Sequence, residues 1–301
     1  MKKETRIIGG HVSIAGGYAE APKRAAEIGG NALQMFSGSP RGWNYARVTK
    51  EQAEEFKAEA KKLGITHSYF HASYLVNLAD DGRNGKMSVD GLVAELNVAS
   101  ALGVRGSIIH LGSFKETNHE TRITNQGLFG NQDVSGYLKS EKYPLLISNI
   151  KAVLKKSPKD VLFIIENMGM RKIGRSFDEI ASIIKDVNDP RVRVCLDTCH
   201  LHVAGYDLST KGKLDAFLKE FDARIGLDRL ECFHINDSRD EFGSLRDRHD
   251  NIGEGKVGKD VFKLILNHPK TKHLPFLLEV PGFDDTGPDR KNVEILRSFI
   301  E

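Results

Sequence analysis

The sequence has little cysteine and no long apolar run. Three cysteines among 301 residues, an odd number without a CxxC pair, imply no disulfide framework and are typical of a reducing compartment such as the cytoplasm. No run of about 18 apolar residues occurs, so we expect no membrane-spanning helix. The charged N-terminus is not followed by an apolar segment, and no signal peptide is predicted.

An excess of charge of one sign is also lacking. The 44 basic and 41 acidic residues leave a net charge of +3, which argues against an indiscriminate, strongly basic nucleic-acid binder. Disorder is excluded because 40% of the residues are hydrophobic, enough to build a core. The length suits either one large α/β barrel or two ordinary domains.

Short apolar runs alternate with longer amphipathic segments along the chain. The runs predict eight strands, at Ile7–Val12, Ala32–Phe36, Ser68–His71, Ser107–Leu111, Val161–Glu166, Val192–Asp197, Leu230–Ile235 and Pro275–Val280. The amphipathic segments predict helices, at Glu51–Leu63, Leu92–Leu102, Tyr143–Leu154, Phe177–Ile184, Leu214–Phe221, Val261–Leu266 and Val293–Ile300.

This alternation predicts a single (β/α)₈ TIM barrel over residues 1–301, with its active site at the C-terminal face of the strands. The alternative is an open doubly wound sheet. Its dinucleotide-binding version lacks support, because no GxGxxG follows the first strand. Residues 113–136 are polar and too long for an ordinary connection, which indicates either a tolerated loop insertion or a loop that contacts substrate.

Ionisable residues stand at or just beyond the ends of six predicted strands. They are His71, His110, Glu166, Asp197, His200, His234 and Glu279. One histidine at a strand end carries little information, but this density of buried imidazoles and carboxylates would be unpaired without a cation. The ligand types fit Zn²⁺ or Mn²⁺.

Two short spacings add to this pattern. Asp197 and His200 lie three residues apart where the sixth strand is expected to turn into a loop, and Asp247 and His249 would share one side of an extended segment. Nine candidate ligands are too many for one ion and suit two or three. Paired ions favour the hydrolysis of phosphoesters.

The same residues carry a resemblance to a known family. The carrying motifs are GGHVS at 9–13, HASYLVNL at 71–78, VCLDTCH at 194–200, AGYD at 204–207, HINDSR at 234–239 and GSLRDRH with IGEG between 243 and 255. With these motifs the chain resembles endonuclease IV, a zinc-dependent family of apurinic/apyrimidinic (AP) endonucleases from base-excision repair, of the deoxyribonuclease IV (phage-T4-induced) type.

The resemblance implies three Zn²⁺ ions per chain, with Mn²⁺ as an alternative at one site. It assigns His71, His110 and the bridging Glu166 to one ion. Glu166 with Asp197, His234 and Glu279 would hold the second ion, and His200, Asp247 and His249 the third. It further implies that activated water, positioned by Glu166, attacks the phosphorus 5′ to an abasic site in double-stranded DNA, leaving a 3′-hydroxyl and a 5′-deoxyribose phosphate. No protein nucleophile is needed, and a monomer is expected.

Substrate contacts are implied at three further positions. Arg41, Tyr74 and Leu75 match residues that the family inserts into damaged DNA, against the alternatives of a solvated charge for Arg41 and core packing for the other two. His11 matches a residue near the site. Gly38 and Ser39 depart from the family pattern, where Lys-Asn is often found, and this departure predicts the loss of a phosphate contact.

Two other functions remain open at this point. A sugar isomerase of the same barrel type would use Glu166, Asp197, His234 and Glu279, but it has no use for the remaining ligands together. A non-catalytic lesion-binding protein would be expected to have lost at least one ligand.

Overall fold

The computed structural model describes residues 6–43, 45–114, 140–169 and 172–301. The predicted insertion at 113–136 therefore lies almost wholly outside the described residues. Among those that are described, no helix is long and apolar enough to cross a membrane.

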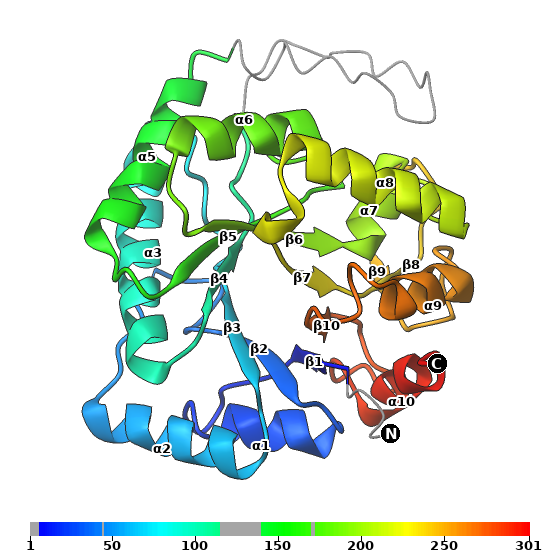
Figure 1. Cartoon of the computed structure of the whole chain (residues 1–301). Coiled ribbons are helices and arrows are strands. Elements are labelled where there is room, and N and C mark those ends of the chain that lie inside the picture. Colours follow the sequence, from blue (N-terminus) through cyan, green and yellow to red (C-terminus); the bar gives the residue numbers. More distant parts are fainter. Residues whose placement is uncertain (1–5, 44, 115–139, 170–171) are drawn as a thin grey trace.

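Eight parallel strands close into a barrel at the centre of the molecule (Figure 1). Their bounds are β1 (Ile8–His11), β2 (Ala32–Phe36), β3 (His67–His71), β4 (Gly106–Ile109), β5 (Leu162–Glu166), β6 (Val192–Asp197), β7 (Leu230–His234) and β10 (Phe276–Leu278). The ring closes because β1 pairs with β2 on one side and with β10 on the other. The predicted barrel is confirmed, and the open sheet is excluded.

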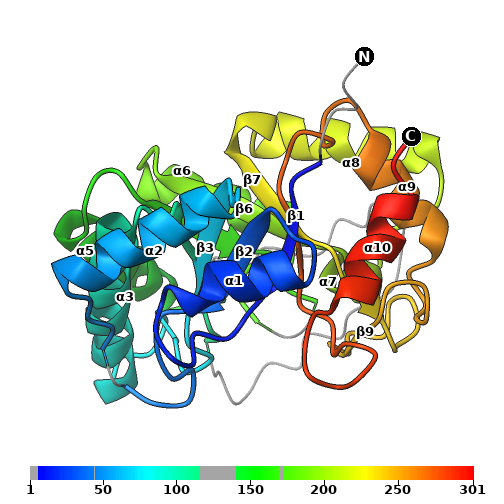
Figure 2. The same ribbon diagram turned by 90° about the horizontal axis from the view of Figure 1, so that it is seen from below.

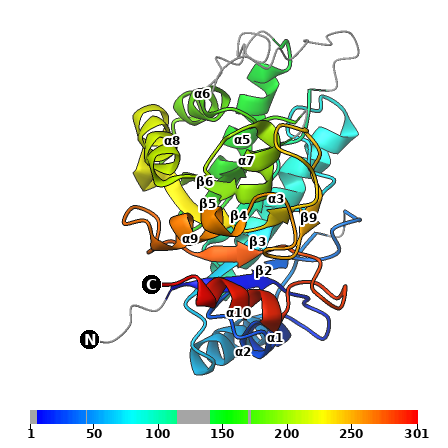
Figure 3. The ribbon, with the colours of Figure 1, turned by 90° about the vertical axis from the view of Figure 1, so that its right-hand side faces the viewer.

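Helices surround this barrel. They are α1 (Glu20–Glu27), α2 (Lys50–Lys62), α3 (Arg83–Leu102), α5 (Tyr143–Lys156), α6 (Phe177–Val187), α7 (Thr198–Ala204), α8 (Lys211–Arg224), α9 (Lys259–Asn267) and α10 (Arg290–Ser298). Neighbouring helices α1 and α2 run side by side along the outside (Figure 2). The last helix lies next to α1, and Arg290 and Arg297 of α10 donate hydrogen bonds to the carbonyls of Glu27 and Gly29 (Figure 3).

Local sequence explains where several elements begin and end. Thr49 and Gln52 form a reciprocal capping box that starts α2. Gly103, with φ of 72°, ends α3 in the left-handed conformation that glycine adopts freely. Gly9 allows β1 and β2 to approach, because a Cβ there would lie 1.9 Å from the carbonyl oxygen of Ala32.

Two helices were not predicted. The short α1 buries only the small residues Ala21, Pro22 and Ala25, so no large apolar side chain marks it in the sequence. The loop expected directly after the sixth strand is wrong, because α7 starts at Thr198, immediately after β6. The Asp197 side chain accepts a hydrogen bond from the backbone N–H of His200 and so caps this helix.

Candidate metal centre

The inner side chains of the barrel form two layers. The lower layer is a cluster of buried residues whose members are Ala32, Tyr69, Ile108, Ile164, Cys195, Cys232 and Leu277. Side chains alternate along a strand, so the residue two positions further on also points inward. In the same strand order these residues are Gln34, His71, His110, Glu166, Asp197, His234 and Glu279, and they form the upper layer at the mouth of the barrel.

The first group of potential ligands joins β3, the end of β4 and β5. Nε2 of His71 lies 3.3 Å from Oε2 of Glu166, and Nε2 of His110 lies 2.8 Å from the same oxygen. One ligand atom from each of these three residues falls within 4.8 Å of the others, a spacing that could hold a metal ion.

The second group shares Glu166 with the first. Nδ1 of His234 lies 3.0 Å from Oε1 of Glu166, 3.8 Å from Oδ2 of Asp197 and 3.3 Å from Oε2 of Glu279. Glu166 thus presents one oxygen to each group, which is the geometry that a bridging carboxylate requires.

The third group depends on a small hairpin. Strands β8 (Asp237–Ser238) and β9 (His249–Asp250) pair antiparallel beside α7. Nε2 of His200, from α7, lies 3.0 Å from Oδ2 of Asp247, and Nε2 of His249 lies 3.5 Å from Oδ1 of the same carboxylate. Asp247 and His249 therefore do face the same way.

Backbone carbonyls orient three of the five histidines. Nδ1 of His71, His200 and His249 lies within hydrogen-bond distance of the carbonyls of Ala72, Asn167 and Glu279, respectively. A carbonyl can only accept, so each Nδ1 carries a proton, and Nε2 is the ring nitrogen left to bind a metal ion.

Three amide side chains support the ligands in a similar way, and the sequence did not reveal them. Gln34 donates to Glu279 and accepts from Nε2 of His234, both at 2.6 Å. Asn236 donates to Asp197, and Asn167 accepts from the backbone N–H of Asp197. The sequence feature that could have identified them is an amide side chain within or next to an apolar strand.

Burial and mutual attraction set the charges of the mouth. Burial lowers the pKa of His234, but Glu279 and Glu166 outweigh it and raise this pKa to about 10. Burial raises the pKa of Glu166, yet His110 and His234 bring it well below its usual range. The pKa of Asp247 falls to about 2, because His200 outweighs burial there. Glu166 and Asp247 thus stay ionised despite their burial.

The residues fit metal ions on two grounds. Among the described residues, His110 Nε2, Glu166 Oε2 and His249 Nε2 are buried without a well-directed hydrogen bond, the 2.8 Å approach of the first two included, and each faces one of the three groups. The donors are imidazole nitrogens and carboxylate oxygens, the set that Zn²⁺ and Mn²⁺ accept. Cys199 also approaches Asp197 and His249, but burial raises its pKa and keeps the thiol protonated.

A cavity of about 790 Å³ opens above the three groups. Tyr74 lines it and is 65% exposed, so the core-packing alternative for this side chain is wrong. Arg239 and Arg248, which the sequence did not reveal as site residues, line it too. Arg41 is exposed and Leu75 is half-buried.

His11 lies beside the second group. Its Nδ1 is 2.9 Å from Nε2 of Gln34 and 3.7 Å from Oε1 of Glu279. Because an amide nitrogen can only donate, Nδ1 of His11 accepts, and burial lowers the pKa of this ring. The neutral imidazole borders the ligands without joining any of the three groups.

Comparisons with known proteins agree with this geometry. The family model of AP endonuclease family 2, described as a xylose isomerase-like TIM barrel, matches residues 22–300. A probable endonuclease 4 of Halothermothrix orenii is 36% identical over 293 residues, which cover 96% of this chain and 99% of the relative. A probable endonuclease 4 of Thermosipho africanus is 32% identical and covers 98% of each chain.

Solved structures show the same relationship. The crystal structure of endonuclease IV from Thermus thermophilus superposes with a TM-score of 0.79 at 30% identity, covering 98% of both chains. A 3-keto-D-glucoside 4-epimerase from E. coli, at 13% identity and a TM-score of 0.67, shares the fold alone. By sequence over nearly its whole length, this chain belongs to AP endonuclease family 2, the endonuclease IV family.

Proposed function

We propose that this protein is a DNA-repair endonuclease that hydrolyses the phosphodiester bond 5′ to an abasic site in double-stranded DNA. The products are a 3′-hydroxyl and a 5′-deoxyribose phosphate, as expected for the deoxyribonuclease IV type. The observation that carries the proposal is the arrangement of nine ligands in three groups, two of which share Glu166. The names of the relatives, probable endonuclease 4 and endonuclease IV, support it.

The three groups would hold three divalent ions, Zn²⁺ throughout or Mn²⁺ at one position. Such ions, when bound, lower the pKa of water and neutralise charge that develops on phosphate oxygens. Glu166 would keep the first two sites in register through its separate oxygens. His200, Asp247 and His249, held by α7 and the hairpin, would fix the third site relative to them.

Other residues of the mouth would bind and orient the DNA. Arg239 and Arg248 border the cavity, where a phosphate backbone must pass. Arg248 donates two hydrogen bonds to Asp240 and Arg239 lies 3.8 Å from Asp250, so these aspartates hold both guanidinium groups in place. Tyr74, Leu75 and Arg41 lie on two adjacent loops after β3 and β2, and we infer that they contact the DNA at the lesion. An abasic nucleotide is easier to unstack than a paired one, because it lacks a base. We also infer that the chain acts as a monomer with a single barrel domain.

An incision assay tests the proposal directly. The purified protein is incubated with a labelled duplex that contains one tetrahydrofuran abasic analogue, with an undamaged duplex as control. We expect metal-dependent incision on the 5′ side of the analogue and no cleavage of the control. Intact damaged duplex at micromolar protein with metal bound would refute the function.

Metal stoichiometry separates this function from a sugar isomerase. An isomerase needs only the second group, with Glu166, Asp197, His234 and Glu279. Elemental analysis of the purified protein should find close to three divalent ions per chain for the nuclease. A single ion, with intact abasic duplex, would favour the isomerase.

A further inference from the structure

One hydroxyl group joins the two loops that carry the proposed DNA contacts. We call residues 37–43, which follow β2, the Arg41 loop, and residues 72–76, which follow β3, the Tyr74 loop. Oγ of Ser73 donates a hydrogen bond to the carbonyl of Pro40 at 2.7 Å and accepts one from the backbone N–H of Leu75 at 3.2 Å. Ser73 thus touches the residue before Arg41 and the backbone of Leu75 at once.

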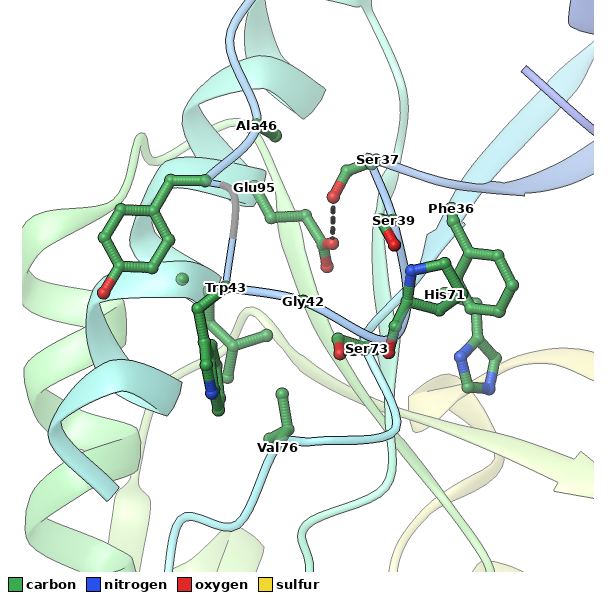
Figure 4. A pocket seen from close by; sticks show the side chains of 15 residues that line it. Phe36, Ser37, Ser39, Gly42, Trp43, Ala46, His71, Ser73, Val76 and Glu95 are labelled. Carbon is green, nitrogen blue, oxygen red and sulfur yellow. Dashed lines mark hydrogen bonds between the residues drawn. The ribbon is translucent and has the colours of Figure 1, made fainter. Parts of the chain in front are cut away.

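The start of the Arg41 loop is anchored to α3. The carboxylate of Glu95, a buried residue of α3, accepts a hydrogen bond from Oγ of Ser37 at 2.5 Å (Figure 4). It accepts another from Oγ of Ser107 in β4. The hydroxyl of Tyr18 donates to the carbonyl of Ser37 at 2.6 Å. Ser37 therefore has little freedom to move.

The end of the Arg41 loop is anchored to the same face of α3, one turn earlier. A Cβ on Gly91 would lie 3.5 Å from the ring of Trp43 and 3.6 Å from that of Tyr45. Both rings therefore lie close to the helix backbone, within van der Waals contact of the Cβ that a larger residue would have. Gly91 and Glu95 are four residues apart and share one side of α3.

The middle of the loop is supported differently. A cavity of about 40 Å³ lies beneath it, between Ser37, Gly42, Trp43 and the side chains of Val76 and Glu95 (Figure 4). Packing contacts are missing across such a gap, so they cannot fix the height of the loop. Within the described residues, the bond from Ser73 is the one hydrogen bond that reaches residues 38–42 from another element.

We propose that Ser73 is a positioning residue for lesion recognition. It sets the Arg41 loop at a fixed distance from Tyr74 and Leu75, so that the three side chains meet one damaged site together. The inference rests on the proposed function for its DNA substrate. Ser73 belongs to none of the three ligand groups and acts on substrate binding, through Arg41, and not on the reacting atoms.

The test uses three single variants, Ser73→Ala, Ser73→Thr and Arg41→Ala, and the double variant that combines Ser73→Ala with Arg41→Ala. Ser73→Ala removes both hydrogen bonds, so we expect KM for the abasic duplex to rise about 5- to 20-fold with kcat within about twofold. Metal content should stay unchanged, and Ser73→Thr, which keeps the hydroxyl, should restore most of the affinity. In the Arg41→Ala background, Ser73→Ala should add little, because the two residues act together.

A matched control comes from α6. Oγ of Ser182 donates to the carbonyl of Asp178 at 2.7 Å, the same bond at the same length far from the mouth. Ser182→Ala should leave KM unaltered. Three results would each overturn the proposal. They are KM increases that multiply in the double variant, a fall in kcat of Ser73→Ala as large as its rise in KM, and an unchanged KM in Ser73→Ala.

Trp43 provides a readout that needs no DNA cleavage. It is the single tryptophan of the chain and lies in the Arg41 loop. Acrylamide should quench its fluorescence more strongly in Ser73→Ala than in wild type, Ser73→Thr or Ser182→Ala, because the loop is released. Failure of the wild type to cut abasic DNA would refute the proposed function. Equal quenching in the wild type and the three variants would refute the role of Ser73, whatever the result of the cleavage assay.

Discussion

The same strands build both layers inside the barrel, but the two layers have different roles. Ile164 and Glu166 are neighbours on one face of β5, as Cys232 and His234 are on β7. All four side chains are buried. The lower pair fills space with apolar atoms, whereas the upper pair places a carboxylate and an imidazole 3.0 Å apart.

This difference shows that burial alone does not determine a residue's role. Lower-layer side chains pack against one another, and the hydroxyl of Tyr69 donates a hydrogen bond to Glu231. Upper-layer side chains retain ionised carboxylates and orphaned ring nitrogens, which packing does not satisfy. The layer that still needs a partner is therefore the layer that binds one. The predictions below separate these two kinds of burial.

The largest expected effect is on the upper layer. Glu166→Gln keeps the size of the side chain but removes the charge shared by two ligand groups. We expect incision to fall at least about 100-fold, because stabilisation of the reacting charges is lost, while affinity for the abasic duplex is largely kept. Single-turnover incision and fluorescence anisotropy measure the two quantities. Unchanged turnover in this variant would remove Glu166 from the mechanism.

The matching change in the lower layer should have the opposite profile. Ile164 is fully buried two residues before Glu166. Ile164→Ala leaves a cavity and should lower the free energy of unfolding by about 2–5 kcal/mol, measured by urea denaturation. Metal content and turnover of the folded protein should stay near wild type. A fall in turnover as large as that expected for Glu166→Gln would mean that the layers are not independent.

Sequence patterns predicted much of this architecture. The eight strands were found because each is an apolar run between charged segments, and seven helices by their amphipathic spacing. Most of the proposed ligands were visible because an apolar strand that ends in His, Asp or Glu is conspicuous. The grouping of Glu166 with both His110 and His234 came from the family resemblance. In each group the ligand atoms lie within 4.8 Å of one another, and their binding of metal stays a prediction.

Other parts of the site depend on contacts between distant segments. Nothing near Asn167 in the sequence indicates that its carbonyl orients His200, 33 residues away. Gln34 reaches His234 across 200 residues. The start of α7 was missed because Asp197 was interpreted only as a ligand, although an aspartate before a helix is also a cap. The sequence did not reveal the role of Ser73 either, because its partner Pro40 lies on another loop.

A carboxylate outside the barrel provides a smaller test of the same comparison. Glu179, in the first turn of α6, is buried beside Arg175, and burial raises its pKa to about 7 despite hydrogen bonds from the backbone N–H groups of Gly174 and Arg175. The folded state thus binds this proton more tightly than the unfolded state, whose pKa is near 4.5. The stability that the proton provides is complete below about pH 4.5 and is lost as the pH rises through about 7.

Glu179→Gln should therefore be more stable than wild type at pH 8, by about 1–3 kcal/mol, and the difference should shrink toward pH 5. Urea denaturation at a series of pH values measures it. A gain in the free energy of unfolding that did not depend on pH would show that the buried charge is not its cause. Ile164→Ala is the control, because its loss of stability should not change with pH.

The smallest effect is expected at the polar group of the lower layer. Tyr69 is buried, and its hydroxyl donates to Oε1 of Glu231 at 2.8 Å, while Nε of Arg105 donates to the same oxygen at 2.6 Å. In Tyr69→Phe, Glu231 keeps its arginine partner, so the loss in stability should be about 0.5–1.5 kcal/mol. Metal content and KM should not change, because the Tyr69 hydroxyl donates to Glu231, which belongs to none of the ligand groups. His71 stands two residues further along β3, and its removal should cost bound metal. If Tyr69→Phe also lost metal, the upper layer would depend on polar contacts below it, and the division between a packed layer and a binding layer would fail at β3.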